Sequence, residues 1–469
     1  MSEHFENDPN SIDVGVGLDE ELTSRHIDRL RDLVAAEDAD AIKSFLEDTH
    51  PADIADLLEQ LPSADRQKIA EIAPDILTPS VLAELEDEIL EDILPLLGDR
   101  QITKAVVAMD SDDATQLIEE LDDERRADVL AALPARDRQE VEASFAFDDE
   151  TAGRLMQREF VAAPEFWTTG QTIDHMRTQY GKGDAALPDL FFDVYVIDAG
   201  FHPIGYVPLS RLVCADRKTA LKDIMQPIPV LIEPETDQED VAYLFEKYDL
   251  ISAPVIDTDG RLTGMITVDD MFEVIQDEHK EDMLALAGVS DAGLADTALT
   301  TVKARAPWLL LNLFTAICAS FVISLFQGSI EKLVALAVLM PIVASMGGNT
   351  GTQALTVAIR ALTTRDLTST TALRTIKREA LAAIINGLIF AVILGLITFV
   401  WFKNADLSFV IAGALVFNLL CAGLAGILVP LGLKKLGADP AVASSVFVTT
   451  VTDMVGFFVF LGMASVFLL

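Results

Sequence analysis

The 469-residue chain is long enough for about three domains, and its formal net charge of −41 is distributed unevenly. Residues 1–299 hold 23 Lys and Arg against 69 Asp and Glu, whereas residues 300–469 hold 11 basic and six acidic residues. A surface this acidic repels nucleic acid and attracts cations, so nucleic acid is excluded as a partner. Solubility and adaptation to salt explain the same charge, and composition alone does not separate these explanations from cation binding.

The first segments predict a disordered acidic N-terminus followed by a helical domain. Residues 1–26 are polar and contain no secretory signal peptide, so we expect the soluble part of the chain to stay in the cytoplasm. Over residues 27–156, short apolar stretches at helical spacing are interrupted by Leu-Pro breaks. Two segments, Leu61-Pro-Ser-Ala-Asp-Arg66 and Leu133-Pro-Ala-Arg-Asp-Arg138, are near copies of one unit. Repeated short helices of this kind predict an all-α superhelical solenoid.

Residues 157–280 have a different pattern, in which β-branched runs such as Phe191–Ile197 and Ile251–Ile256 alternate with helical stretches. This predicts an α+β unit present twice, and it resembles a tandem pair of cystathionine-β-synthase-type (CBS) domains. Thr267-x-x-Asp270 is similar to the ribose-contacting motif of nucleotide-binding CBS domains. The similarity implies a nucleotide such as ATP at Thr267 and Asp270. A structural turn, or a metal site that uses the same aspartate, explains the motif as well.

Acidic residues are dense between Asp269 and Asp282, and several recur at three- or four-residue spacing. At this spacing they share one face of a helix. Solvation of an exposed face is the ordinary explanation, and binding of a divalent cation is the functional one. We expect the next segment, residues 281–303, to form a helix that connects the soluble part to the membrane part.

Five apolar stretches fill residues 304–469, and each reaches the roughly 20 residues that a helix needs to cross a bilayer. They are Ala306–Gln327, Leu333–Leu355, Ala380–Trp401, Phe409–Leu433 and Ser445–Leu468. Nine basic residues in the short connections lie on the side of the N-terminus, and only Lys332 and Lys403 lie on the other side. Basic residues favour the inside, so the sequence predicts a multi-pass protein of the cytoplasmic membrane. Its N-terminus would be cytoplasmic and its C-terminus outside.

Asp453 is the one acidic residue well inside a predicted span. A carboxylate there costs about 2.5–3.5 kcal/mol and is tolerated when it faces water or a cation. Thr449 and Gly456 share its helical face, and Asn349 and Gln353 add neutral oxygens in the second span. Few carboxylates and many neutral oxygens suit Mg²⁺, which keeps much of its own water. One aspartate per chain is too little for an ion path, so a symmetric homodimer is expected.

Three further segments make a family resemblance specific. Gly347-Gly-Asn-Thr-Gly-Thr-Gln353, Leu436-Gly-Ala-Asp-Pro440 and Thr452-Asp-Met-Val-Gly456 resemble signature segments of the MgtE magnesium-channel family, in the same order. The resemblance implies a multidomain protein with an all-α solenoid, α+β tandem CBS domains, a plug helix and five transmembrane helices. It also implies that Asp453 binds the ion in the pore and that Asn349 lies beside it.

The resemblance further implies a cytosolic Mg²⁺ sensor, made of acidic residues from the solenoid, the second CBS domain, the plug helix and one membrane loop. The matching positions are Asp112, Glu239, Asp249, Asp270, Glu273, Glu278, Glu281, Asp282 and Asp439. Without Mg²⁺ these carboxylates would repel one another and the path would open. With Mg²⁺ bound, the closed state would be favoured, because a ligand shifts an equilibrium by its differential affinity for the two states.

Two other functions compete with a passive Mg²⁺ channel. A coupled secondary transporter would be expected to carry further acidic residues or His within the spans, and none are found there. A membrane-anchored enzyme would need a nucleophile–base pair, a P-loop or a Cys/His metal cluster, and none of these appears. The sequence therefore favours a channel over a transporter, and either of them over an enzyme.

Overall fold

A computed structural model describes residues 20–180, 187–188, 190–289, 298–363, 365, 367, 369–441 and 444–469. The chain divides into two compact units, residues 1–276 and 277–469. Residues 1–19 of the expected disordered N-terminus lie outside the described residues, and the first described helix already begins at Glu20, ahead of the expected boundary at residue 27.

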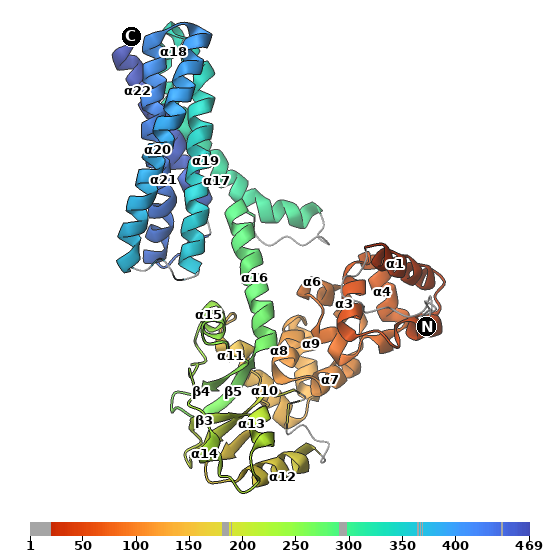
Figure 1. Cartoon of the computed structure of the whole chain (residues 1–469). Coiled ribbons are helices and arrows are strands. Elements are labelled where there is room, and N and C mark those ends of the chain that lie inside the picture. Colours follow the sequence, from red (N-terminus) through yellow and green to blue (C-terminus); the bar gives the residue numbers. More distant parts are fainter. Residues whose placement is uncertain are drawn as a thin grey trace, which may run out of the picture. The chain divides into compact units, whose positions relative to one another are not determined.

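The N-terminal part of the first unit consists of short stacked helices, as predicted (Figure 1). They are α1 (Glu20–Ala35), α2 (Ala39–Leu46), α3 (Pro51–Glu59), α4 (Ser63–Ile72), η1 (Pro74–Ile76), α5 (Pro79–Ala83), α6 (Asp87–Ile93), η2 (Leu94–Leu96), α7 (Asp99–Ala108), α8 (Ser111–Glu119), α9 (Asp123–Ala132), α10 (Ala135–Ser144) and α11 (Ala152–Leu155). Leu, Ile and Val side chains from α1 through α10 form one continuous buried core. None of these short helices could bury its apolar face alone, so stacking supplies the stability.

Two arginines, Arg66 and Arg126, mark a repeat within this helical stack. Arg66 is 2% exposed and donates to the carbonyls of Glu59 and Leu61, and Arg126 donates in the same way to the carbonyls of Glu119 and Leu121. Each guanidinium therefore satisfies carbonyls left free at the end of a preceding helix. The predicted near copy ending in Arg138 does not make these bonds, so the structural equivalent of Arg66 is Arg126.

The second part of the first unit contains two small sheets with the same design. The first joins β1 (Ala162–Pro164), β2 (Asp193–Ile197) and β3 (Pro203–Pro208), and the second joins β4 (Ser252–Ile256) and β5 (Leu262–Thr267). Each sheet has an antiparallel hairpin that is irregular near the end of its first strand, at Val196/Ile197 and at Val255/Ile256. The helices of this region are α12 (Thr169–Tyr180), α13 (Leu209–Cys214), α14 (Leu221–Ile224) and α15 (Gln238–Tyr248). The repetition confirms the predicted α+β unit present twice.

The two repeats exchange short segments. Gln157, at the start of the first repeat, pairs with Met265 of β5 in the second repeat through two hydrogen bonds of 2.9 Å. Gln226, at the start of the second repeat, pairs in the same way with Tyr206 of β3 in the first repeat at 2.8 and 3.0 Å. Gly264 and Gly205 allow these close approaches, because an added Cβ would lie 2.8 Å and 2.9 Å from the backbone oxygens of the two glutamines.

Helix α16 (Val268–Ala287) follows β5 and contains the boundary between the two units. It ends where Gly288 adopts a positive φ of 68°, a conformation that glycine accepts at a helix C-terminus. The connecting helix expected over residues 281–303 is therefore not one continuous helix. Residues 290–297 lie outside the described residues, and the next helix begins at Ala298.

The second unit is a bundle of long helices (Figure 1). The long helices are α17 (Ala298–Ser324), α19 (Ala335–Thr363), α20 (Ser369–Phe402), α21 (Ala405–Lys435) and α22 (Ser444–Phe467), and the short helix α18 (Gln327–Lys332) lies between α17 and α19 in the chain. Within the described residues, four stretches are long and apolar enough to cross a membrane: Thr301–Ser324, Thr371–Phe402, Ala405–Lys435 and Ser445–Phe467. Helix α19 has 29 residues but is not among the four, because its glycine and polar residues lower its hydropathy. The count of five spans therefore stays a prediction.

Candidate ion path and acidic sites

The candidate ion-path residues lie on two neighbouring helices of the second unit. Asp453 is half-buried in α22, and Thr449, one turn earlier, is exposed. Asn349 is exposed on α19. These helices pack closely at this level, because a Cβ at Gly351 of α19 would lie 2.6 Å from Val448 Cγ1 of α22. Asp453 and Asn349 thus lie near the same helix crossing.

Gly456 does not continue the polar face that Thr449 and Asp453 begin. It is buried, and a Cβ at this position would lie 2.8 Å from Nδ2 of Asn418 in α21. The prediction that Gly456 shares the polar face of a pore lining was therefore wrong, because the glycine makes room for a side chain of another helix. Asn418 was missed in the sequence, although an amide within an otherwise apolar span is itself a signal.

In the first unit, an acidic group forms where α8 meets the start of α16. Burial, and next the charge of Asp270, raise the pKa of Asp112 well above its usual range and that of Asp113 to about 7. Burial raises the pKa of Asp270 to about 6, against a hydrogen bond from Thr267 Oγ1 of 2.7 Å. The predicted residues Asp112 and Asp270 are thus brought together. Asp113 was missed, because only the fold shows that it and Asp270 interact.

In the second unit, Asp282 of α16 lies near Asp439, which follows α21. Burial, and next the charge of Asp439, raise the pKa of Asp282. Thr363 Oγ1 at the end of α19 donates to Asp282 Oδ2 at 3.4 Å, and Asp439 Oδ1 accepts from the Ala441 amide at 2.8 Å. Two residues that are far apart in the sequence, and that the family resemblance assigned to one sensor, therefore repel each other in the fold.

The other candidate sensor residues are distributed over α15 and α16. Glu239 lies in the first turn of α15, and Asp249 ends that helix with a φ of 50°. On α16, Glu273 and Glu281 are exposed and Glu278 is half-buried. Among the residues that the structure describes, no three His, Cys, Asp or Glu side chains lie close enough to hold a metal ion.

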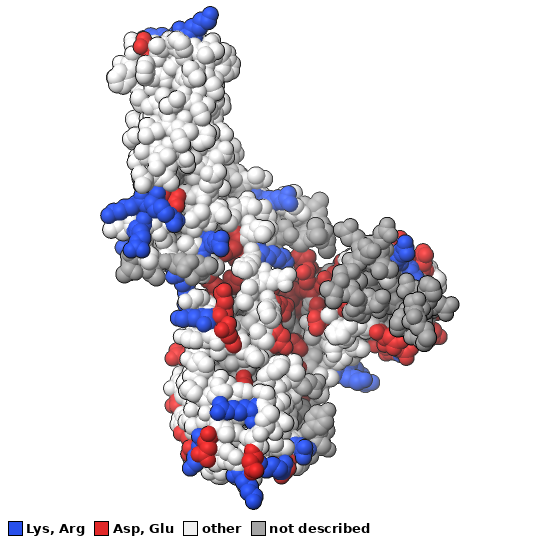
Figure 2. All heavy atoms as spheres, in the orientation of Figure 1, with Lys and Arg blue, Asp and Glu red and all other residues white. Residues whose placement is uncertain are grey.

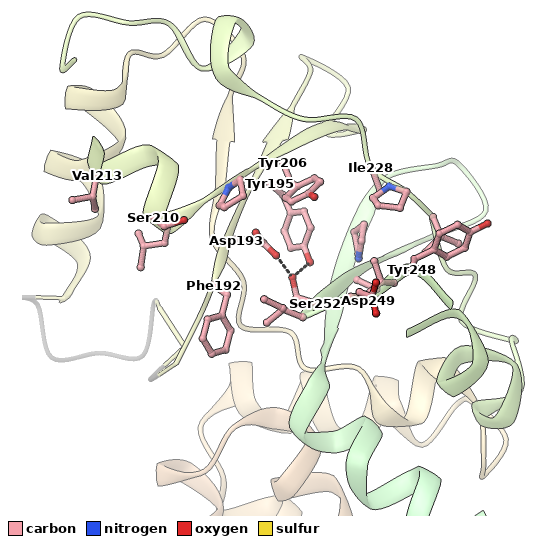
Figure 3. Close-up of a pocket in the computed structure, with 18 of the residues that line it drawn as sticks. Phe192, Asp193, Tyr195, Tyr206, Ser210, Val213, Ile228, Tyr248, Asp249 and Ser252 are labelled. Atoms are coloured by element: carbon pink, nitrogen blue, oxygen red, sulfur yellow. Dashed lines mark hydrogen bonds between the residues drawn. The ribbon is translucent and has the colours of Figure 1, made fainter. Parts of the chain in front are cut away.

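A pocket of about 620 Å³ lies between the two repeats of the α+β region (Figure 3). Tyr195, 2% exposed, and Ser252 form a hydrogen bond of 2.8 Å in its wall. Ser252 Oγ in turn donates to Asp193 Oδ2 at 2.9 Å, so the tyrosine hydroxyl donates to the serine. Burial raises the pKa of Asp193. The described lining residues are mostly apolar or aromatic, with Asp193 and Asp249 as their only charged side chains.

Thr267 and Asp270 do not line this pocket. Asp270 instead accepts hydrogen bonds from Thr267 and faces the acidic residues of α8. Of the three explanations weighed for this motif, a nucleotide site, a structural turn and a metal site, the geometry favours a turn capped by hydrogen bonds between Thr267 and Asp270.

Comparison with known proteins gives three matching domains and several full-length relatives. Residues 340–463 match the MgtE divalent cation transporter domain, residues 49–150 the MgtE intracellular N domain, and residues 221–277 the CBS domain. The magnesium transporter MgtE of Bacillus subtilis (strain 168) is 31% identical over 428 residues, covering 91% of this chain and 94% of the relative. The magnesium transporter MgtE of Thermus thermophilus is 32% identical over 448 residues, covering 94% and 98%. The cytosolic domain of the Mg²⁺ channel MgtE in complex with ATP is 29% identical, covers 53% of this chain and 99% of that chain, and gives a TM-score of 0.48.

Proposed function

Because the chain belongs to the MgtE family of magnesium transporters, we propose that it is a Mg²⁺-selective channel for magnesium uptake across the cytoplasmic membrane. The observation that carries this proposal is Asp453, a half-buried carboxylate in the apolar helix α22. Exposed Thr449 on the same helix and Asn349 on the neighbouring helix supply neutral oxygens. Such a set can hold Mg²⁺ largely through the water that the ion retains.

The ion path in this proposal is completed by a second copy of the chain. Thr449 and Asn349 are exposed in a single chain although they are polar and lie on membrane-domain helices. In a symmetric homodimer the same patch meets its own copy, so two Asp453 carboxylates would line one path. A water-filled path between the copies also keeps these polar groups away from lipid.

The proposed orientation places the N-terminus in the cytoplasm. Within the second unit, Lys and Arg gather at one end of the helical bundle, and few lie at the other end (Figure 2). The crowded end includes Arg360 at the end of α19 and Lys434 and Lys435 at the end of α21. Basic residues concentrate on the cytoplasmic side of membrane proteins, which supports this orientation.

Closure by cytoplasmic Mg²⁺ is proposed to act on the two acidic groups, Asp112/Asp113/Asp270 and Asp282/Asp439. In these groups burial, and next a neighbouring carboxylate, raise the pKa of Asp112, Asp113 and Asp282, so each group costs free energy when it is ionised. A divalent cation removes this cost and therefore favours the conformation in which the carboxylates are close. The remaining predicted sensor residues are proposed to contribute in the same way.

ATP at the CBS repeats remains part of the proposal, with the pocket of Figure 3 in place of Thr267 and Asp270. Aromatic walls suit a nucleobase, and the Asp193 carboxylate can accept from an exocyclic amine. Binding of labelled ATP, with Ser252→Leu as the pocket variant, tests this assignment, and equal binding by the variant would reject it.

The function is tested by Mg²⁺ flux into liposomes that contain the wild-type protein, Asp453→Ala or Asp406→Asn. Asp406 is the matched control, because it is an aspartate in the first turn of α21 rather than within a helix interior. We expect flux to be lost in Asp453→Ala and kept in Asp406→Asn. Unchanged flux in Asp453→Ala would reject the assigned path. A requirement for a proton or sodium gradient would favour the coupled transporter instead.

A further inference from the structure

Helix α21 is the central helix of the membrane unit, and it carries one buried amide. In its apolar stretch 56% of the residues are buried, against 11% for α17 and 33% for α22. Asn418 lies near the middle of this stretch and is 0% exposed. A buried amide in an apolar helix is costly unless it is hydrogen-bonded, so its contacts call for an explanation.

The Asn418 side chain joins α21 to the two helices that carry the candidate ion-path residues. Its Nδ2 donates to the Val343 carbonyl of α19 at 2.9 Å. Because a backbone carbonyl only accepts, this bond also decides which end of the amide is nitrogen. One turn further along α19, an added Cβ at Gly347 would lie 2.3 Å from Nδ2, and one at Gly456 of α22 would lie 2.8 Å from it. The amide thus fills a space that two glycines leave on opposite helices.

The same side chain retains an unsatisfied atom. Among the described residues, Oδ1 of Asn418 has no hydrogen-bond partner and is buried. An unpaired buried acceptor costs about 1–3 kcal/mol. A leucine of similar size would pack at this position without that cost, so packing alone does not account for the asparagine.

We infer that Asn418 is a positioning residue of the ion path, and this inference rests on the proposed channel function. Gly456 follows Asp453 by three residues and Gly347 precedes Asn349 by two, which corresponds to roughly 3–4.5 Å along each helix. Asn418 therefore sets the distance and rotation of α19 and α22 within one turn of both candidate ion-path residues. Its hydrogen bond to Val343 fixes the register of α19, and its contact with Gly456 fixes the approach of α22.

The test compares Mg²⁺ flux for Asn418→Leu, Gly456→Ala, Asn418→Ala and the double variant Asn418→Ala/Gly456→Ala, with Asp453→Ala in the same series. Gly432→Ala is the control, because an added Cβ there has nothing within 4 Å and Gly432 is also on α21. Elution volume and melting temperature establish that each variant is folded.

We expect Asn418→Leu to remain folded, to raise the apparent KM for Mg²⁺ about tenfold and to weaken discrimination against Mn²⁺ and Ca²⁺. Gly456→Ala should lose flux, and Asn418→Ala in the same chain should restore part of it, because the alanine then has room. A purely structural role would change only the melting temperature. Wild-type KM and selectivity in Asn418→Leu, with no rescue in the double variant, would overturn the inference while leaving the channel proposal intact. Full flux in Asp453→Ala would overturn both.

Discussion

Glu159 caps the N-terminus of helix α8, although it is distant from that helix in the sequence. Its replacement should therefore destabilise α8. Ser111 begins α8, and both its backbone N and its Oγ donate to Glu159 Oε2, at 3.2 and 2.8 Å. Ser111 Oγ in turn accepts from the Arg158 amide at 2.8 Å. A hydrogen bond to a charged group contributes about 1.5–3 kcal/mol, and a carboxylate at a helix N-terminus about 0.3–1 kcal/mol. Because Glu159 is only half-buried, we expect Glu159→Ala to cost about 2 kcal/mol locally.

Amide hydrogen exchange of the full-length protein, without Mg²⁺, measures this cost. A loss of about 2 kcal/mol corresponds to roughly 30-fold faster exchange of the α8 amides. Glu159→Gln separates the two contributions, because an amide oxygen still accepts but carries no charge, so a smaller increase is expected. Asp122→Ala is the matched control: Asp122 caps α9 through the Arg125 amide at 3.0 Å, and its loss should affect α9 alone.

Unchanged exchange in α8 after Glu159→Ala would refute the reasoning, and so would an equal increase in α8 and α9. The result matters for function because α8 carries Asp112 and Asp113 in its first turn. If the cap orients these carboxylates, the Mg²⁺ concentration that closes the path should rise in the same variant.

Three further predictions concern stability, pH and gating. Arg66→Met should destabilise the helical stack by about 3 kcal/mol in chemical denaturation, because it leaves Asp92 and two backbone carbonyls unpaired. The control Lys43→Met breaks an exposed ion pair and should cost under about 1 kcal/mol. Equal losses of stability in the two variants would contradict this. Burial, and next the charge of Asp87, raise the pKa of Glu120 to about 7, so ionised Glu120 destabilises the fold above that pH, and the penalty disappears as pH falls toward the unfolded value near 4.5. Glu120→Gln should therefore raise the melting temperature at pH 8 and have little effect at pH 5, and a gain that is independent of pH would reject the assignment. Asp282→Asn should raise several-fold the Mg²⁺ concentration that halves flux in liposomes, and an unchanged value would remove Asp282 from the sensor.

The architecture could be predicted because its signals are local. An apolar stretch of about 20 residues, a Leu-Pro break and a β-branched run each report on their own segment, and the predicted domain types were confirmed. The connecting helix was predicted less well, because Gly288 was not recognised as a helix end. Whether there are four or five membrane spans depends on α19. The glycines that make α19 similar to a family signature segment also lower its mean hydropathy.

The details of the sites depend on contacts that the sequence does not contain. The role of Asn418 follows only from its packing against Gly347 and Gly456, which are some 70 and 40 residues away in the sequence. Asp113 was missed for the same reason, since its partner Asp270 is distant in the chain. Asp282 and Asp439 were assigned to one sensor only through family resemblance, because nothing in their local sequence links them, and that role stays a prediction.

The exchange of segments between the two CBS repeats has a consequence for how this region unfolds. Gln157 pairs with β5 of the second repeat and Gln226 pairs with β3 of the first, so each repeat has backbone hydrogen bonds to the beginning of the other. Separating the two repeats would therefore remove from each one the segment of the other repeat that is hydrogen-bonded to it. We therefore expect residues 151–276 to melt in one cooperative transition, and a fragment that holds a single repeat to aggregate through its exposed strand edge. Strain applied to one repeat by a ligand or a neighbouring helix would then reach the other through backbone hydrogen bonds.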